Sequence, residues 1–105
     1  MTPDLVVRME PGDDGPPRLR VAGEIDLSNV ERFRQSLSTG APAGSALIVD
    51  LTGISYIDSA GISALFERAR RGGLEIVADE DSVVAPLIRI TRLDQLAVVR
   101  PSSSG

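Results

Sequence analysis

The sequence contains no cysteine, histidine, tryptophan or lysine, so arginine supplies all eleven of its basic side chains. Without cysteine and histidine, the chain cannot form disulfides, a thiol nucleophile, the usual zinc sites or a Ser–His catalytic pair. Without lysine, it also lacks the residue on which lysine-dependent active sites rest. We therefore expect a protein that is not an enzyme and that holds no metal or other cofactor.

The chain is also poor in aromatic side chains, which make up 3% of it, and its net charge is −4. A nucleic-acid partner needs a basic stripe or aromatic platforms for base stacking, and the sequence offers neither. No apolar run approaches the ~20 residues that span a bilayer, and the N-terminus lacks a basic-then-apolar signal pattern. We expect a cytoplasmic protein with no direct nucleic-acid partner and no membrane partner.

Apolar periodicity predicts one α/β domain with the element order β-β-α-β-α-β-α-β. The turn-rich segment PGDDGPP separates the first two strands and predicts an N-terminal hairpin, so the sheet is mixed although mostly parallel. Strands are expected at residues 5–10, 18–23, 45–51, 74–78 and 95–100, and the three to four helices include residues 30–37, the segment after Ser59 and residues 82–92. The domain is expected to cover residues 1–101, with a flexible tail at 102–105.

Two of these segments carry a clear burial pattern. Residues 45–51, SALIVDL, are almost continuously apolar, which is typical of a strand buried on both faces, and a short loop is expected to follow. In the helix after Ser59, a 3.6-residue period divides the side chains between two sides. The inward side is expected to hold Ile62, Leu65, Phe66 and Ala69, and the outward side Glu67, Arg68, Arg70 and Arg71.

Polar residues gather in two loops, each of which follows a strand and opens a helix. These loops are GEIDLSN at residues 23–29 and DSAG at residues 58–61. In an open α/β sheet, the loops at the carboxyl ends of parallel strands lie at one edge. If the two strands are neighbours, we expect a cluster at that edge formed by Asp26, Ser28, Asn29, Asp58 and Ser59.

Ser59 has two readings on position alone. At or next to the start of a helix, it could accept a hydrogen bond from an unpaired N–H group as an ordinary cap. The same N–H groups and the helix dipole also stabilise negative charge, so Ser59 could instead be a phosphorylation switch, although position alone favours the cap. Gly61 leaves a similar choice, because either a close approach to the backbone or tight packing of the helix on the sheet would favour glycine there.

Three enzymatic alternatives find weak support in the residues. A serine hydrolase needs a base for its nucleophile, and neither His nor Lys is present. A receiver-type phospho-aspartate domain could use Asp50, but the lysine of that family has no counterpart. A metal site could draw on Asp26, Asp50 and Asp58, although Asp50 falls within a strand and three scattered carboxylates are a weak signal.

The two loops in this order resemble the signatures of the STAS family, specifically those of the bacterial anti-sigma factor antagonists. VAGEIDLSN is similar to the first signature, and LIVDLTGISYIDSAGISAL to the more specific second one, in which an apolar strand leads to Asp-Ser-x-Gly at a helix start. RRGGLEIVADEDSVVAPLIRITRLDQLAVV resembles the C-terminal third of the family in spacing and pattern. The resemblance covers nearly the whole chain and implies a STAS-like fold.

The resemblance implies a partner-switching function. In that family, the domain binds an anti-sigma factor, which is a small ATP-dependent serine kinase, and so releases the sigma factor. The kinase phosphorylates the serine of Asp-Ser-x-Gly and ends the interaction, and a phosphatase restores it. Carried over, Ser59 is the phosphoacceptor, and the partner-binding residues are Asp26, Ser28, Asn29, Asp58, Ser59, Ala60 and Gly61.

The chain departs from the family pattern at three positions. Ala60 stands where relatives often carry a second hydroxyl, Ile62 replaces a common leucine, and Arg92 replaces a glycine that often ends the last helix. The last departure leaves the geometry of that helix end open. An alternative function within the family is also open: a STAS subunit that docks on the ATPase of a lipid-transport ABC system, with Ser59 never phosphorylated.

Overall fold

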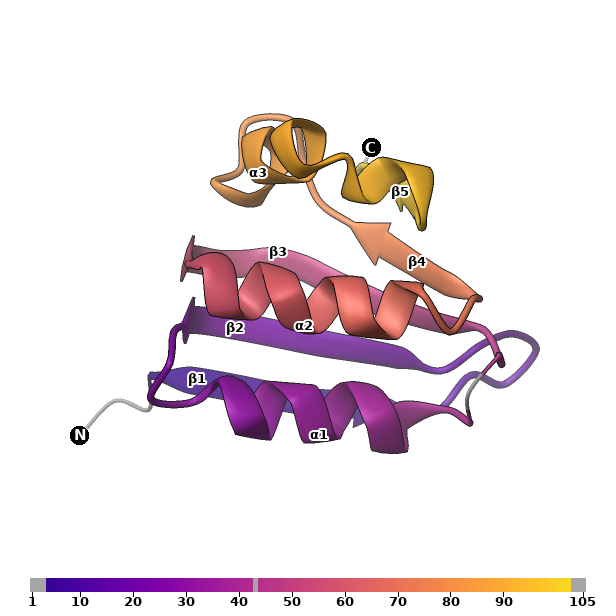
Figure 1. The fold of residues 1–105 in the computed structure, drawn as a ribbon. Coiled ribbons are helices and arrows are strands. Elements are labelled where there is room, and N and C mark those ends of the chain that lie inside the picture. The colour runs from indigo at the N-terminus through magenta and orange to yellow at the C-terminus, as the bar shows by residue number, and fades with distance from the viewer. Residues whose placement is uncertain (1–3, 43, 103–105) are drawn as a thin grey trace.

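A computed structural model describes residues 4–42 and 44–102 of the chain. Five strands lie side by side in the order β1-β2-β3-β4-β5, with β1 antiparallel to β2 and the following pairs parallel. In chain order, the elements are β1 (Leu5–Glu10), β2 (Arg18–Ile25), α1 (Val30–Gly40), β3 (Leu47–Ile57), α2 (Ser59–Ala69), β4 (Leu74–Val77), α3 (Val84–Thr91), the 3₁₀ helix η1 (Leu93–Gln95) and β5 (Val98–Arg100). This order confirms the predicted α/β domain with its N-terminal hairpin and mixed sheet (Figure 1).

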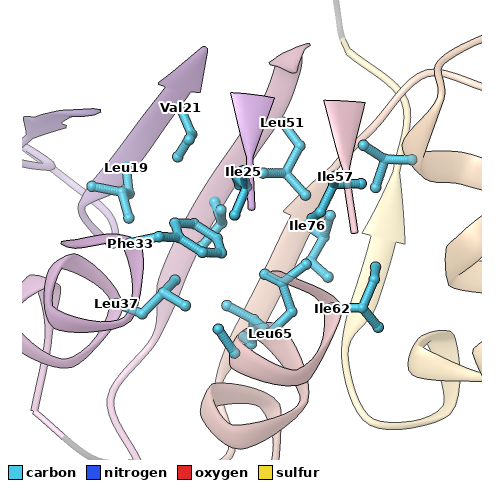
Figure 2. Packing of buried hydrophobic residues seen from close by; sticks show 14 of the residues in the cluster. Leu19, Val21, Ile25, Phe33, Leu37, Leu51, Ile57, Ile62, Leu65 and Ile76 are labelled. Carbon is cyan, nitrogen blue, oxygen red and sulfur yellow. The ribbon is translucent and has the colours of Figure 1, made fainter. Parts of the chain in front are cut away.

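The two faces of the sheet differ because side chains alternate along β2. Leu19 and Val21 are buried on the face that α1 and α2 cover, and they pack near Phe33 (Figure 2). Arg18 and Arg20 lie on the opposite face, where both guanidinium groups contact the Asp50 carboxylate. The hairpin therefore contributes an apolar surface to the core and a charged surface to the outside.

The core fills the space between the sheet and the helices (Figure 2). Phe33 and Leu37 enter it from α1, Leu65 from α2, Leu51 from β3 and Ile76 from β4, and each is at most 1% exposed. Because this cluster is continuous from β1 to η1, the elements fold around one core. The described residues contain no helix long and apolar enough to cross a membrane.

β3 is longer than the sequence pattern predicts. The expected strand ended at residue 51 before a loop, but β3 continues to Ile57 and stays paired with β2. In this extension only Ile54 and Ile57 are buried, so the apolar residues recur every third position. Register shifts between β2 and β3 produce this spacing, and a period of two could not detect it.

Ile62, Leu65 and Ala69 of α2 are buried as expected, but two side chains near its C-terminus differ from expectation. Arg68, expected on the outside, is 2% exposed, and it donates from Nη1 to the Gly72 carbonyl and from Nη2 to the Ser45 carbonyl, both at 2.8 Å. Phe66, expected inside, is only partly buried, with the Arg70 guanidinium 5.6 Å from its ring centroid. Gly72 follows the end of α2 and Ser45 precedes β3, so the buried guanidinium ties the turn after α2 to the segment that leads into β3.

The C-terminal elements differ from expectation in extent. The helix expected at 82–92 is confined to Val84–Thr91, and the first part of the strand expected at 95–100 is instead the end of η1. Arg92 ends α3 in the left-handed conformation, with φ 62°, which is the conformation a glycine would adopt most easily. Of the expected tail, Ser102 donates its backbone N–H to Asp79 Oδ1 at 2.8 Å, and residues 103–105 lie outside the described residues.

Candidate functional site

The register of β2 against β3 brings the two predicted loops together. Ile25 at the end of β2 is paired with Ile57 at the end of β3, and the Asp58 N–H donates to the Ile25 carbonyl at 3.2 Å. Asp26 and Asp58 are therefore the first residues beyond two paired strand ends. The cluster expected from the sequence required the strands before the two loops to be neighbours, and β2 and β3 are neighbours.

The loop at residues 26–29 is held by its own side chains. Asp26 Oδ1 accepts hydrogen bonds from the Ser28 backbone N–H at 2.9 Å and from the Ser28 hydroxyl at 2.5 Å. Asn29 Oδ1 accepts from the Asp26 N–H at 3.0 Å, and its Nδ2 donates to the Glu24 carbonyl at 2.9 Å. Asn29 thus directly precedes α1, but its side chain forms hydrogen bonds within the loop and does not cap the helix.

These contacts also set the charge of the loop. The hydrogen bond from the Ser28 hydroxyl, followed by the one from the Ser28 backbone, lowers the pKa of Asp26 below its ordinary value. An aspartate at its ordinary pKa of 3.8 is already ionised near neutral pH, and these hydrogen bonds keep Asp26 ionised to lower pH. Beside it, Leu27 is 80% exposed, which is unusual for a leucine and gives the loop an apolar tip. Sequence reasoning missed Leu27, although an isolated leucine among loop-forming polar residues was a visible signal.

The cap of α2 is Asp58 and not Ser59. Asp58 Oδ1 accepts hydrogen bonds from the backbone N–H groups of Ala60 at 2.9 Å and Gly61 at 3.3 Å. Ser59 is the first residue of the helix, its side chain is exposed, and its hydroxyl makes no hydrogen bond within the described part of the chain. The reading of Ser59 as a plain cap is therefore wrong, and its hydroxyl is left accessible.

Gly61 brings α2 close to the sheet. A Cβ at this position would lie 2.6 Å from Ile57 Cγ1 and 2.8 Å from Ile25 Cγ2, both too short for a real contact. These isoleucines are the last residues of β3 and β2. Of the two explanations that the sequence left for Gly61, tight packing of the helix on the sheet is the one that applies.

The carboxylate triad considered as a metal site does not form. Asp50 lies within β3, on the sheet face away from the core, and its carboxylate contacts Arg18 and Arg20. Asp26 and Asp58 lie instead at the edge where β2 and β3 end. Among residues 4–42 and 44–102, no group of three or more acidic side chains is placed to hold a metal ion.

Residues 9–100 match a family model described as Mlab, STAS domain. The chain belongs to the STAS domain family. The match takes in both loops of the candidate site and every element from the end of β1 to β5. The structural elements and the two signature loops thus agree with the resemblance seen in the sequence.

Solved structures show the same fold in anti-sigma factor antagonists. One from Mycobacterium paratuberculosis is 25% identical, covers 97% of this chain and 91% of its own, and has a TM-score of 0.79. The antagonist SpoIIAA in its unphosphorylated form is 18% identical, with coverages of 94% and 90% and a TM-score of 0.70. SpoIIAA of Bacillus in its phosphorylated form is 20% identical, with coverages of 94% and 93% and a TM-score of 0.67.

Proposed function

We propose that this STAS domain is an anti-sigma factor antagonist whose binding to an anti-sigma factor is ended by phosphorylation of Ser59. The observation that carries the proposal is the separation of roles at the start of α2. Asp58 caps the helix, so the exposed hydroxyl of Ser59 is free to react. The resemblance of the chain to antagonists, at 25% identity in one case, supports the same function.

The partner surface in this proposal consists of the loop at 26–29 and the start of α2. It includes Asp26, Ser28 and Asn29 on one side and Asp58, Ser59, Ala60 and Gly61 on the other. Paired strand ends hold the two segments next to each other, and the hydrogen bonds of Asp26 fix the first one. A preorganised surface loses little conformational entropy on binding, which favours a stable complex.

The partner is proposed to be an anti-sigma factor of the ATP-dependent serine kinase type, and a phosphoserine phosphatase reverses the modification. The domain supplies a hydroxyl but has no histidine or lysine to activate it, so we infer that it is a substrate and a binding protein rather than an enzyme. We place this exchange in the cytoplasm, where sigma factors act. SpoIIAA, which shares the fold, has been solved in a phosphorylated form.

Electrostatics explains how a phosphate at Ser59 would end binding. Phosphoserine adds a charge of about −1.5 to −2. The N-terminal end of α2 tolerates this charge because of the helix dipole. Asp58 and Asp26 give the same edge negative charge, so an acidic or nucleotide-bearing partner surface would be repelled. A loss of about 3–4 kcal/mol would weaken the complex several-hundred-fold.

The direct test is phosphorylation by the cognate kinase with ATP, followed by mapping of the phosphate. Ser59→Ala is expected to abolish labelling, whereas Ser63→Ala, an exposed serine one turn later in α2, is expected to leave it unchanged. In a binding titration, Ser59→Asp should weaken the complex with the anti-sigma factor. Labelling that survives Ser59→Ala would refute the assignment of the phosphoacceptor.

The second candidate is a STAS subunit that docks on the ATPase of a lipid-transport ABC system. The family model carries the name Mlab beside STAS domain, so a match to it supports the family without choosing between the two functions. In the second candidate, the same surface is an interface and Ser59 is not modified. Co-purification separates the two: recovery of a transporter ATPase, without an anti-sigma factor, would favour the second.

A further inference from the structure

The face of the sheet turned away from α1 and α2 carries a row of five residues, four of which are charged. These residues are paired with one another across the five strands. In order from β1 to β5, they are Arg8, Arg20, Asp50, Val77 and Arg100. This face takes no part in the Ser59 surface, which lies at the edge where β2 and β3 end. It therefore needs an explanation of its own.

Asp50 anchors the middle of this row. It is 6% exposed, and both of its oxygens are occupied: Oδ1 accepts from the Thr52 N–H at 3.0 Å and hydroxyl at 2.6 Å. Oδ2 accepts from Arg18 Nη1 at 3.3 Å and from Arg20 Nη1 at 3.2 Å. The carboxylate is thus shielded, while the two arginine side chains it contacts remain partly exposed, at 30% for Arg18 and 50% for Arg20.

Positive charge accumulates at the β1 side of the row. Arg8 stands directly opposite Arg20, and like charges in a cross-strand pair are destabilising. Arg20 has Glu10 as an additional partner at 2.9 Å, but Arg8 makes no ion pair within the described residues. An anion placed between the two guanidinium groups would relieve this repulsion.

Small apolar residues lie beside this pair. In the next row of the sheet, Val6 is paired with Ala22, and Ala22 with Gly53; Val6 is 48% exposed and Ala22 is exposed. The surface here forms a hollow of about 270 Å³, whose lining includes these three residues together with Arg8 and Arg20. It adjoins a second hollow of about 590 Å³, and the two share Arg20, Asp50 and Thr52.

The second hollow is less suited to an anion. Its lining adds Arg18 and Arg100, but also Asp79. Arg100 is already paired with Glu75 at 2.5 Å, and Asp79 contributes a carboxylate that accepts from the Ser102 backbone. The end of the groove at Arg8 thus combines unbalanced positive charge with an apolar floor, which the end at Arg100 does not.

We propose that this groove binds a small amphiphilic anion. Its carboxylate or phosphate head lies between Arg8 and Arg20, and its apolar body lies over Val6, Ala22 and Gly53. Arginine is well suited to this role because its planar guanidinium forms paired hydrogen bonds with either head group. The proposal does not depend on the proposed function, since it uses none of the residues around Ser59.

The test is a titration of the ¹⁵N-labelled protein with octanoate and with octyl phosphate below their micelle concentrations. Both are expected to shift the backbone amides of Ala22, Thr52 and Gly53 in a saturable way. Inorganic phosphate and octanol, which carry only the head or only the body, are expected to bind about tenfold more weakly or worse. Octanol binding as tightly as octyl phosphate would overturn the role of the arginines.

Two variants and one control localise the site. Arg8→Gln removes the unpaired charge and should weaken binding about tenfold. Ala22→Gln fills the apolar floor and should abolish binding; both positions are exposed, so folding is preserved and the amide spectrum checks it. Arg89→Gln, an exposed position on α3, changes the net charge equally and should have no effect. No saturable shifts, or equal weakening by Arg8→Gln and Arg89→Gln, would overturn the proposal.

Discussion

At the start of α2, three nearly consecutive residues have separate roles. Asp58 caps the helix, Ser59 exposes its hydroxyl, and Gly61 sets how closely the helix approaches the sheet. The sequence could identify this motif but could not divide the roles, because Asp58 and Ser59 are both good caps. Only the hydrogen bonds from Ala60 and Gly61 to Asp58 decide which of them caps.

Gly61→Ala is expected to destabilise the protein by about 1–3 kcal/mol, because the new methyl group overpacks the contact with Ile57 and Ile25. Urea denaturation measures the effect. Ser63→Ala, at an exposed position of the same helix, is the matched control and should change stability little. In an open helix, alanine would instead be the better residue by about 1 kcal/mol. A variant more stable than the original protein would therefore contradict the packing argument.

Arg68 shows where residue patterns mislead. Its charge and its position in the helical period both predicted exposure, yet it is buried and donates to two carbonyls. Burial by itself lowers the pKa of Arg68, and the nearby charge of Arg71 acts in the same direction. The carbonyl of Ser45 lies far away in the sequence, so no local pattern could reveal this contact.

At the scale of elements, β3 connects the charged row on the outer face with the edge that holds the candidate site. Its first part carries Asp50 on the outer face, and its extension leads to the edge where Asp58 and Ser59 lie. Burial tends to raise the pKa of Asp50, but the hydrogen bonds of Thr52 and the charges of Arg20 and Arg18 outweigh it, so the pKa lies below the usual 3.8. Ionised Asp50 therefore stabilises the folded state.

The sign of this shift predicts acid sensitivity. A carboxyl group whose pKa is lowered by folding contributes stability above its unfolded pKa, and this contribution is lost as the pH falls through the folded pKa. Asp50→Asn is expected to lower the free energy of unfolding at pH 7 by about 1–3 kcal/mol. Below about pH 5, the free energy of unfolding of the variant should fall less steeply with pH than that of the original protein. Urea denaturation from pH 7 to pH 3 measures both. Parallel pH profiles for the two proteins would rule out Asp50 as a source of the acid sensitivity.

At the scale of the whole molecule, the proposed switch acts at an edge that the core does not need. The core lies between the sheet and the helices, whereas Ser59 is exposed as the first residue of α2. The start of α2 lies where β2 and β3 end (Figure 1). Added charge at that edge can change which partner binds while the fold stays the same. A switch of this kind alters the surface rather than the conformation.

Phosphorylation of Ser59 is accordingly expected to change the free energy of unfolding by less than about 0.5 kcal/mol relative to the unmodified protein. This corresponds to a shift in Tm of less than about 4 °C. Thermal unfolding of the modified and unmodified protein provides the measurement. Gly61→Ala, which should shift Tm clearly, is a positive control for sensitivity. A large fall in Tm on phosphorylation would mean that the domain rearranges, contrary to a switch based on local repulsion.

The sequence by itself determined the order of the elements, the hairpin, the apolar faces and the two signature loops, because each depends on local periodicity or turn chemistry. It did not determine the extension of β3, the burial of Arg68 or the row of arginines beside Asp50. These depend on strand register and on contacts between distant residues. The candidate site around Ser59 depends on both levels. The local sequence determines the two signature loops, and the pairing of Ile25 with Ile57 in the sheet brings those loops together.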